Sequence, residues 1–201
     1  MSSIGILAYG SLIEDPGAEL KSLVSKKITD IETPFNIEFA RSSQSRDGAP
    51  TVIPVVNYGS PVKAVILVLS DSVDVAKAKD LLWRRETRQE NSDKCYPNPI
   101  NPSLNQVVVA EIVGLGGIEI VFYTEIGANI DAPTPQKLAA FAIESARGEA
   151  GSEGKDGISY LISVKRQNID TPLMAQYEKE ILKSVGTSSL SEALTIVRKN
   201  A

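Results

Sequence analysis

The 201-residue sequence contains no histidine. Without histidine the chain cannot carry a Ser-His-Asp or Cys-His nucleophile system, a histidine proton shuttle or a metal bound by imidazole. Any acid–base chemistry therefore falls to Asp, Glu, Lys, Tyr or Cys. Ser11 is not expected to act as a nucleophile, because no histidine is present to activate it and no Ser-x-x-Lys pattern begins there.

Cysteine is almost as scarce, because Cys95 is the only one in the chain. A single cysteine excludes an internal disulfide and a cysteine-rich zinc site, so we expect no metal centre. The only basic residue beside Cys95 in the sequence is Lys94. A nucleophilic role for this thiol is therefore less favoured than a thiol without function.

Long apolar runs and clustered basic charge are also missing. No run approaches the roughly 20 apolar residues that span a bilayer, and the start at Met1 leads into an apolar segment without the basic region of a signal peptide. The formal net charge is −4 and the basic residues are scattered, which excludes an obvious nucleic-acid or membrane-surface footprint. We expect a cytoplasmic protein whose partner is a small molecule or another protein.

Segments that are continuously or alternately apolar predict the β-strands. The segment 62–69 is apolar almost throughout, which is typical of a strand inside a sheet. The glycines between 114 and 117 predict a hairpin turn between the last two strands. The predicted strands are residues 4–9, 35–41, 51–56, 62–69, 107–113 and 118–124.

Helical periodicity dominates the end of the chain, and the clearest single helix is 72–88, with Ser72 as its candidate N-cap. Strands first and helices later indicate an α+β fold with a mainly antiparallel or barrel-like sheet and a helical tail. The length suits one domain with an extension. A short amphipathic segment lies at residues 19–24, and the predicted helices are residues 72–88, 136–147, 157–167, 172–185 and 190–199.

The first predicted strand ends in Tyr9, Gly10, Ser11 and Leu12, where an ordinary strand would end in Asn, Asp or Pro. A glycine between a large polar-tipped ring and a hydroxyl group lets the backbone turn several N–H groups toward one point. The pattern is typical of a loop that binds a ligand.

A second unusual feature is "LLWRRETRQE", at the end of the predicted helix 72–88. Glu86 shares a helix face with Leu82 and Trp83, and an apolar setting would raise its pKa toward the value that a general base needs. The alternative is a solvated helix end on which Glu86 and the neighbouring charges only form ion pairs. The pattern by itself favours this alternative.

Arg41 is a further candidate, at the end of a predicted strand beside Ser42 and Ser43. It either pairs with a substrate carboxylate or is an exposed arginine at a strand end, and the residues leave both interpretations open.

The stretch "LAYGSL" resembles the Tyr-Gly-Ser loop of the γ-glutamylcyclotransferase-like family. In that family a catalytic glutamate follows several strands and one helix later, in one branch within an Arg-Glu dipeptide, and Arg85-Glu86 occupies that place here. The intervening "PFNIEFARSS", "APTVIPVV" and "PVKAVILVLS" follow the family's strand order. Further on, "GISYLISVKRQNIDTPLMAQYEKEIL" is similar to the helical tail of the branch that cleaves glutathione.

The resemblance implies a γ-glutamylcyclotransferase-like domain at residues 1–130, with a mixed or antiparallel barrel-like sheet and flanking helices. A C-terminal helical extension at 131–201 would pack on the same domain. In the implied reaction, the α-amine of a γ-glutamyl compound attacks its own side-chain amide, closes a 5-oxoproline ring and expels the other amine. Because both reacting groups are in one molecule, no protein nucleophile, metal or cofactor is required.

The resemblance also assigns roles to residues. Glu86 would take a proton from the α-ammonium and return one to the leaving amine, a role worth roughly 10² to 10⁴ in rate. Backbone N–H groups of Gly10, Ser11 and Leu12 would hold the substrate carboxylate or the developing oxyanion. Tyr9 belongs to the same loop. Arg41, a candidate by its place in the sequence rather than by the resemblance, completes the expected substrate site.

Three consecutive residues depart from the glutathione-cleaving branch. That branch follows its glutamate with Gly-Gly-Tyr, whereas Thr87-Arg88-Gln89 follows Glu86 here. Tyr96, in the proline-rich segment downstream, either replaces the missing ring or packs on Pro97. The identity of the γ-glutamyl substrate stays open.

Two other classes of function are compatible with the sequence. The chain could be a catalytically inactive module of the same fold that binds a small anionic or γ-glutamyl ligand, or a protein that uses its helical tail as an interface. A carboxylate aimed at an anionic ligand costs Coulomb energy, so Glu86 favours an enzyme over a pure binder. The expected partners are a small γ-glutamyl substrate and a second copy in a homodimer, without nucleic acid or membrane.

Overall fold

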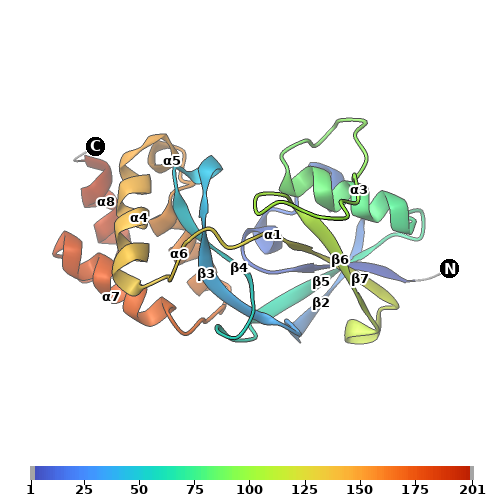
Figure 1. Ribbon diagram of the computed structural model, residues 1–201, viewed down its shortest axis with the longest axis horizontal. Coiled ribbons are helices and arrows are strands. Elements are labelled where there is room, and N and C mark those ends of the chain that lie inside the picture. Colours follow the sequence, from blue (N-terminus) through green and yellow to red (C-terminus); the bar gives the residue numbers. More distant parts are fainter. Residues whose placement is uncertain (1–2, 200–201) are drawn as a thin grey trace. The chain divides into compact units, whose positions relative to one another are not determined.

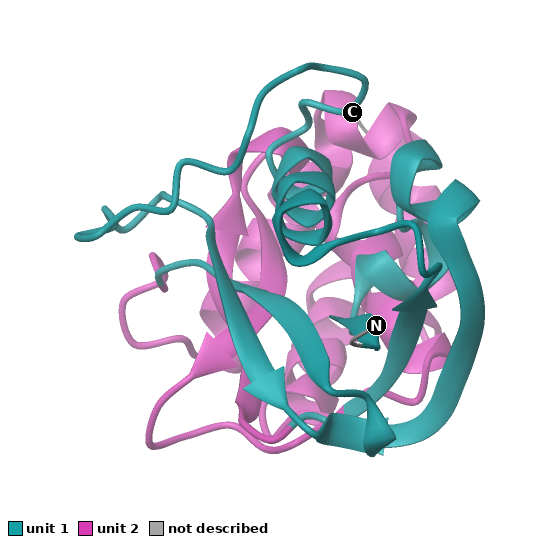
Figure 2. Cartoon of the chain, turned by 90° about the vertical axis from the view of Figure 1, so that its right-hand side faces the viewer, with its two compact units in different colours: residues 1–33, 63–127 teal, residues 34–62, 128–201 magenta. Residues whose placement is uncertain are grey.

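The computed structural model describes residues 3–199. The chain divides into two compact units. Unit 1 comprises Met1–Thr33 and Lys63–Gly127, and unit 2 comprises Pro34–Val62 and Ala128–Ala201; Figure 2 colours them separately. Each unit therefore draws on two separate stretches of the sequence.

Unit 1 is built on a sheet of five strands, β1 (Ile4–Ala8), β2 (Val24–Glu32), β5 (Lys63–Leu69), β6 (Val108–Val113) and β7 (Ile120–Glu125). Their order is β2-β5-β1-β7-β6 (Figure 1). β1 pairs antiparallel with β5 and parallel with β7, and the outer pairs are antiparallel. The sheet is therefore mixed, and β5 lies inside it, as its apolar sequence predicts.

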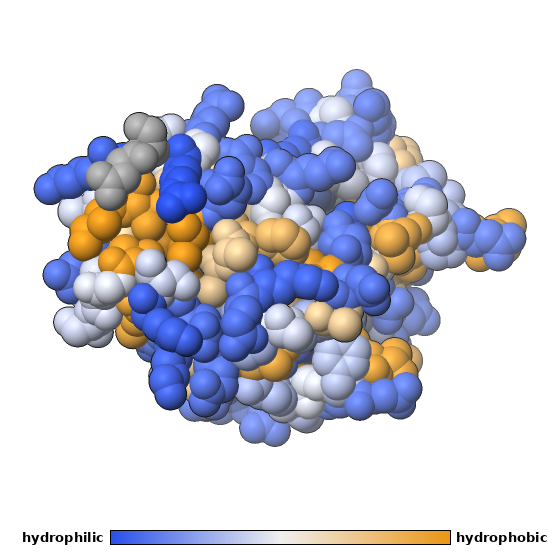
Figure 3. All heavy atoms as spheres, turned by 60° about the vertical axis from the view of Figure 1, so that its left-hand side comes forward, coloured by the Kyte–Doolittle hydropathy of each residue, from blue (hydrophilic) through white to orange (hydrophobic). Residues whose placement is uncertain are grey.

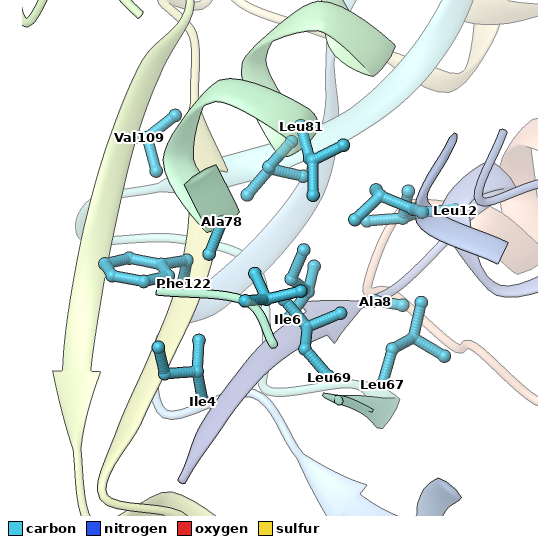
Figure 4. Close-up of a cluster of buried hydrophobic side chains, with 13 residues drawn as sticks. Ile4, Ile6, Ala8, Leu12, Leu67, Leu69, Ala78, Leu81, Val109 and Phe122 are labelled. Carbon is cyan, nitrogen blue, oxygen red and sulfur yellow. The ribbon is translucent and has the colours of Figure 1, made fainter. Parts of the chain in front are cut away.

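Three helices belong to unit 1: α1 (Ser11–Glu14), α2 (Ala18–Leu23) and α3 (Val75–Glu86). Ala78 and Leu81 on α3 point toward Ile6 and Phe122 of the sheet, and Leu12 on α1 reaches the same buried cluster (Figure 4). Burial of each large apolar side chain contributes about 1.5–3 kcal/mol. This cluster fixes α1 and α3 on the sheet.

Unit 2 contains the two-stranded antiparallel sheet of β3 (Asn36–Ser43) and β4 (Ala49–Val55), joined through the short 3-10 turn η1 (Gln44–Arg46). The ring of Phe39 on β3 is fully buried and meets Tyr177 edge-on at 5.1 Å and Tyr160 edge-on at 6.3 Å between centroids. These rings join the hairpin to the helices of the unit. The helices are α4 (Pro135–Arg147), α5 (Glu149–Ser152), α6 (Gly157–Arg166), α7 (Met174–Val185) and α8 (Leu190–Lys199).

A buried carboxylate connects two of these helices. Asp156 is the N-cap of α6, where Oδ1 accepts from the N–H groups of Ile158 and Ser159, each at 2.9 Å. Its Oδ2 accepts from Arg198 on α8 at 2.8 Å. One fully buried side chain thus caps α6 and anchors the end of the chain's last helix.

The observed fold confirms the predicted α+β class, with a mixed sheet, flanking helices and a C-terminal helical segment. The hairpin predicted across Gly114 to Gly117 is formed by β6 and β7, with the 3-10 turn η2 (Leu115–Gly117) between them. The prediction of Ser72 as an N-cap is wrong. α3 begins at Val75, and the Asp74 side chain caps it by accepting from the Lys77 N–H at 2.8 Å.

β2 is a strand that the sequence does not predict. Its nine residues are mostly exposed, and its three apolar residues, Val24, Ile28 and Ile31, are spaced by four and three rather than by two. Two register shifts interrupt its pairing with β5. Charged residues and bulges are typical of an edge strand, and they remove the alternation by which a strand is recognised.

No helix within residues 3–199 is long and apolar enough to cross a membrane. Figure 3 shows the hydropathy of one face, where apolar atoms gather beside the C-terminal end of α8 in unit 2. The homodimer named among the expected partners stays a prediction.

Candidate active site

The loop after β1 has a backbone conformation that only glycine adopts without strain. Gly10 has φ 61° and ψ −137°, and it is the residue before α1. No side chain caps the N-terminus of α1, and the first N–H groups of a helix have no acceptor inside it. The chain therefore leaves β1 through a sharp turn whose backbone donors point away from the helix they begin.

The side chains around Gly10 have different surroundings. The Tyr9 hydroxyl donates to the carbonyl oxygen of Thr124 on β7 at 3.2 Å, and Leu12 is buried in the core of unit 1. These two contacts hold both ends of the loop. Ser11 is partly exposed. The binding of a ligand by its hydroxyl and by the loop backbone stays a prediction.

Glu86 is the last residue of α3, and the helix ends just after it in a Schellman motif. The Arg88 N–H donates to the Arg85 carbonyl at 3.3 Å and the Gln89 N–H donates to the Arg84 carbonyl at 2.8 Å. Arg88 has φ 56°, a left-handed conformation in which helices usually place glycine. A carboxylate at a helix C-terminus is electrostatically unfavourable, so the charge of Glu86 needs a partner.

That partner is Arg85. Its Nη1 donates to Glu86 Oε1 at 2.7 Å, and the two side chains are 14% and 24% exposed. The same guanidinium donates from Nε and Nη2 to the carbonyl oxygen of Asp15, at 3.1 and 2.5 Å. Its Nη2 also lies 3.5 Å from Ser11 Oγ. One arginine therefore brings together the carboxylate at the end of α3 and both ends of α1.

The sequence left open that Glu86 lies on a solvated helix end whose charges only form ion pairs. Ion pairs are present at this helix end, but their side chains are partly buried rather than solvated. Arg84, next to Arg85, donates from Nε and Nη2 to the two carboxylate oxygens of Glu19 on α2, at 3.1 and 3.0 Å. Its hydrogen bond holds the pKa of Glu19 below its usual value and raises the pKa of Arg84. Arg84 joins α3 to α2, whereas Arg85 joins it to α1.

Two acceptor atoms just beyond α3 are buried without a hydrogen-bond partner. They are Oε1 of Gln89 and Oε1 of Glu90. Glu90 lies close to Gly17. A Cβ atom added to that glycine would lie 2.3 Å from Glu90 Oε1. The segment after Glu86 therefore packs tightly against the turn that leads from α1 to α2.

Arg41 belongs to unit 2. It lies within β3, beside a register shift, and its backbone carbonyl accepts from Thr51 Oγ1 at 3.2 Å. It is half-buried rather than an exposed strand end, and this burial lowers the pKa of its guanidinium. Its role toward a substrate carboxylate stays a prediction.

The sequence did not identify how the candidate residues are connected. Asp15 accepts from Arg85 across 70 positions, through a backbone carbonyl that any residue could supply. No side-chain signal in the sequence marks such an acceptor. Cys95 is exposed, and no group of three or more Cys, Asp or Glu side chains within residues 3–199 is placed to hold a metal ion.

No protein-family model and no curated protein matches the chain in sequence. Among solved structures, a crystal structure of a γ-glutamyl cyclotransferase specific to glutathione, from yeast, is similar to it. The two share 14% sequence identity with a TM-score of 0.57, over 91% of this chain and 99% of that chain. The chain has the γ-glutamyl cyclotransferase fold.

On this cyclotransferase fold, the loop of residues 9–12 follows β1 and Glu86 ends α3. The position expected to carry Gly-Gly-Tyr carries Thr87-Arg88-Gln89, and Arg88 takes the left-handed conformation without being glycine. The departure in sequence therefore leaves the helix end well formed.

Proposed function

We propose that the protein is a γ-glutamylcyclotransferase that releases 5-oxoproline from a γ-glutamyl amine or peptide. One observation carries the proposal: in a cyclotransferase fold, the Glu86 carboxylate and the Ser11 hydroxyl share the guanidinium of Arg85. A proton carrier and a turn of free backbone donors are the two parts that this reaction needs from a protein.

The proposed reaction is an internal acyl transfer. The α-nitrogen of the γ-glutamyl group forms a bond to its own side-chain carbonyl carbon, and the amide bond to the leaving amine breaks. The attacking nitrogen, initially an ammonium, loses two protons overall, and the leaving amine gains two. Glu86 carries protons between these nitrogens, a role worth roughly 10² to 10⁴ in rate. The remaining rate enhancement comes from holding the substrate in a folded conformation that brings its two reacting groups together.

The loop of residues 9–12 binds the substrate through its backbone. The N–H groups of Gly10, Ser11 and Leu12 donate to the substrate carboxylate or to the oxyanion that develops at the carbonyl. The side chain of Leu12 is buried and the Tyr9 hydroxyl is bound to Thr124, so both act by holding the turn. Any side chain at position 10 would strain that turn, because of its positive φ.

The substitution Glu86→Gln tests the proposal. Glutamine keeps the size of the side chain and accepts from Arg85, but it does not carry a proton. We expect the fold and ligand binding to survive while turnover falls by about two orders of magnitude or more. Turnover is measured as 5-oxoproline released from a panel of glutathione, γ-glutamyl amino acids and γ-glutamyl amines.

Glu19→Gln is the matched control, because Glu19, on α2, is the carboxylate that pairs with Arg84, the neighbour of Arg85 on α3. We expect it to retain turnover. Equal activity of Glu86→Gln and the parent would refute Glu86 as the proton carrier. Saturable binding of a panel member without any product would instead favour a binding module of the same fold.

A further inference from the structure

We infer that Arg85 is the positioning residue of the proposed reaction: it holds the Glu86 carboxylate and the turn from Ser11 to Asp15 in one arrangement. The inference rests on the proposed function and adds a residue to it. Arg85 does not carry protons; it acts through the groups that it binds.

The contacts of Arg85 use all three nitrogen atoms of its guanidinium. Nη1 binds Glu86, Nε binds the Asp15 carbonyl, and Nη2 binds that carbonyl and approaches Ser11 Oγ. A planar guanidinium presents these donors in fixed directions. The guanidinium therefore fixes the orientation of the Glu86 carboxylate, which Nη1 binds, relative to the loop, which Nε and Nη2 bind.

α1 has few other constraints. It is a single turn of four residues without a side-chain cap, and Leu12 is its only buried residue. The Asp15 carbonyl lies at its C-terminal end, where helix carbonyls lack partners inside the helix. Two N–H groups of Arg85 satisfy this carbonyl, so the arginine closes the C-terminal end of the turn whose N-terminal end begins at Gly10.

Arg84 provides the contrast. It is adjacent to Arg85, it is 12% exposed against 14%, and it also pairs with a glutamate. Its donors bind Glu19 and the carbonyl of Lys94. Loss of Arg84 removes a similar ion pair from α3 and leaves the contacts of Glu86 and α1 in place.

The test compares Arg85→Gln, Arg85→Lys and Arg84→Gln with the parent. We expect Arg85→Gln to lower kcat by about 10- to 100-fold, the scale of a misplaced catalytic group, with a smaller change in KM. Arg85→Lys keeps the positive charge but not the planar set of donors, so its kcat should lie between those of the parent and Arg85→Gln. Arg84→Gln should keep kcat within about threefold, as expected of a structural contact away from the reacting groups.

A second arm separates positioning from general stability. In a Glu86→Gln background, adding Arg85→Gln should reduce kcat by a clearly smaller factor than it does in the parent, because the part of its effect that runs through Glu86 is already lost. Hydrogen exchange of the amides from Ser11 to Asp15 should accelerate in Arg85→Gln and not in Arg84→Gln. This readout is independent of turnover.

Each outcome discriminates. An active parent with an equally active Arg85→Gln variant overturns this inference alone, and so does an equal loss of kcat in Arg84→Gln. A loss of kcat from Arg85→Gln that is as large in the Glu86→Gln background as in the parent also overturns it, because it shows that Arg85 acts independently of Glu86. A parent without turnover on any panel member overturns the proposed function, and this inference with it.

Discussion

Tyr96 connects the segment after α3 to the sheet of unit 1. Its N–H donates to Asp80 Oδ1 at 2.7 Å, and its hydroxyl accepts from the Val109 N–H at 3.0 Å. Its ring lies 6.5 Å from that of Trp83 and packs against the core of the unit. These contacts account for the position of Tyr96 without a substrate, whereas its packing on Pro97 and its role as the missing ring both stay predictions.

The substitution Tyr96→Phe tests this role at the scale of one residue. It removes the acceptor of the Val109 N–H, which should cost about 1 kcal/mol of unfolding free energy and leave turnover unchanged. Urea unfolding measures the first effect and 5-oxoproline release the second. Tyr58→Phe is the control, since Tyr58 is 41% exposed. A large loss of turnover without a loss of stability would place the Tyr96 ring at the substrate.

At the scale of elements, the end of α3 is the part of unit 1 that holds the other two helices. Its adjacent arginines diverge, one to α2 through Glu19 and the other to α1 through the Asp15 carbonyl. The Schellman motif after Glu86 fixes where the helix ends. A change of helix length here would alter both connections at once.

The pairing of α2 with α3 should depend on pH. Arg84 holds the pKa of Glu19 below its usual 4.5 in the folded protein, so the stabilisation is present above the unfolded pKa and is lost as the pH falls through the folded pKa. We expect the parent to exceed Glu19→Gln in stability by about 1 kcal/mol near neutral pH. The difference should shrink below about pH 4.

Thermal unfolding of both proteins across this pH range gives the comparison. Glu111→Gln, at an exposed pair with Lys79, should show little difference from the parent at any pH. A gap between parent and Glu19→Gln that stayed constant down to strongly acidic pH would contradict the role of the ionised carboxylate.

At the scale of the whole molecule, the chain forms two compact units. Residues 34–62 share unit 2 with the helices that follow residue 128. The buried side chain of Glu38 on β3 shows why: Oε1 accepts from Thr171 Oγ1 at 2.6 Å and from the Phe39 N–H at 2.9 Å. Its Oε2 accepts from the Leu173 N–H at 3.0 Å, just before α7. The domain boundary expected at residue 130 stays a prediction.

The substitution Glu38→Gln should destabilise unit 2. One acceptor oxygen becomes an NH₂ group that faces N–H or O–H donors, which should cost about 1–3 kcal/mol. Hydrogen exchange should show the largest loss of protection in peptides from β3 and α7. Glu144→Gln, whose side chain is 78% exposed, should change the stability by under about 0.5 kcal/mol. Unchanged protection in Glu38→Gln would contradict the role of this carboxylate.

Local sequence signals determined most helices and strands of this protein and indicated candidate residues for a site. Apolar runs and alternation located β1 and β3 to β7, and helical periodicity located the long helices, to within a few residues, because such patterns are contained in a window of one element. The Tyr9 to Leu12 loop stood out by residue type, and the absence of histidine excluded whole classes of chemistry. The proton carrier proposed at Glu86 depended on the resemblance to a family.

The tertiary structure decided which elements meet. It revealed β2, whose bulges hide its pattern, and the parallel pairing of β1 with β7, which join residues more than a hundred positions apart. It also placed Arg85 on the Asp15 carbonyl, and Glu38 against Thr171. Contacts of this kind depend on how distant elements pack, and a backbone acceptor has no residue type by which to recognise it. The connection between Glu86 and its loop is therefore a property of the folded chain.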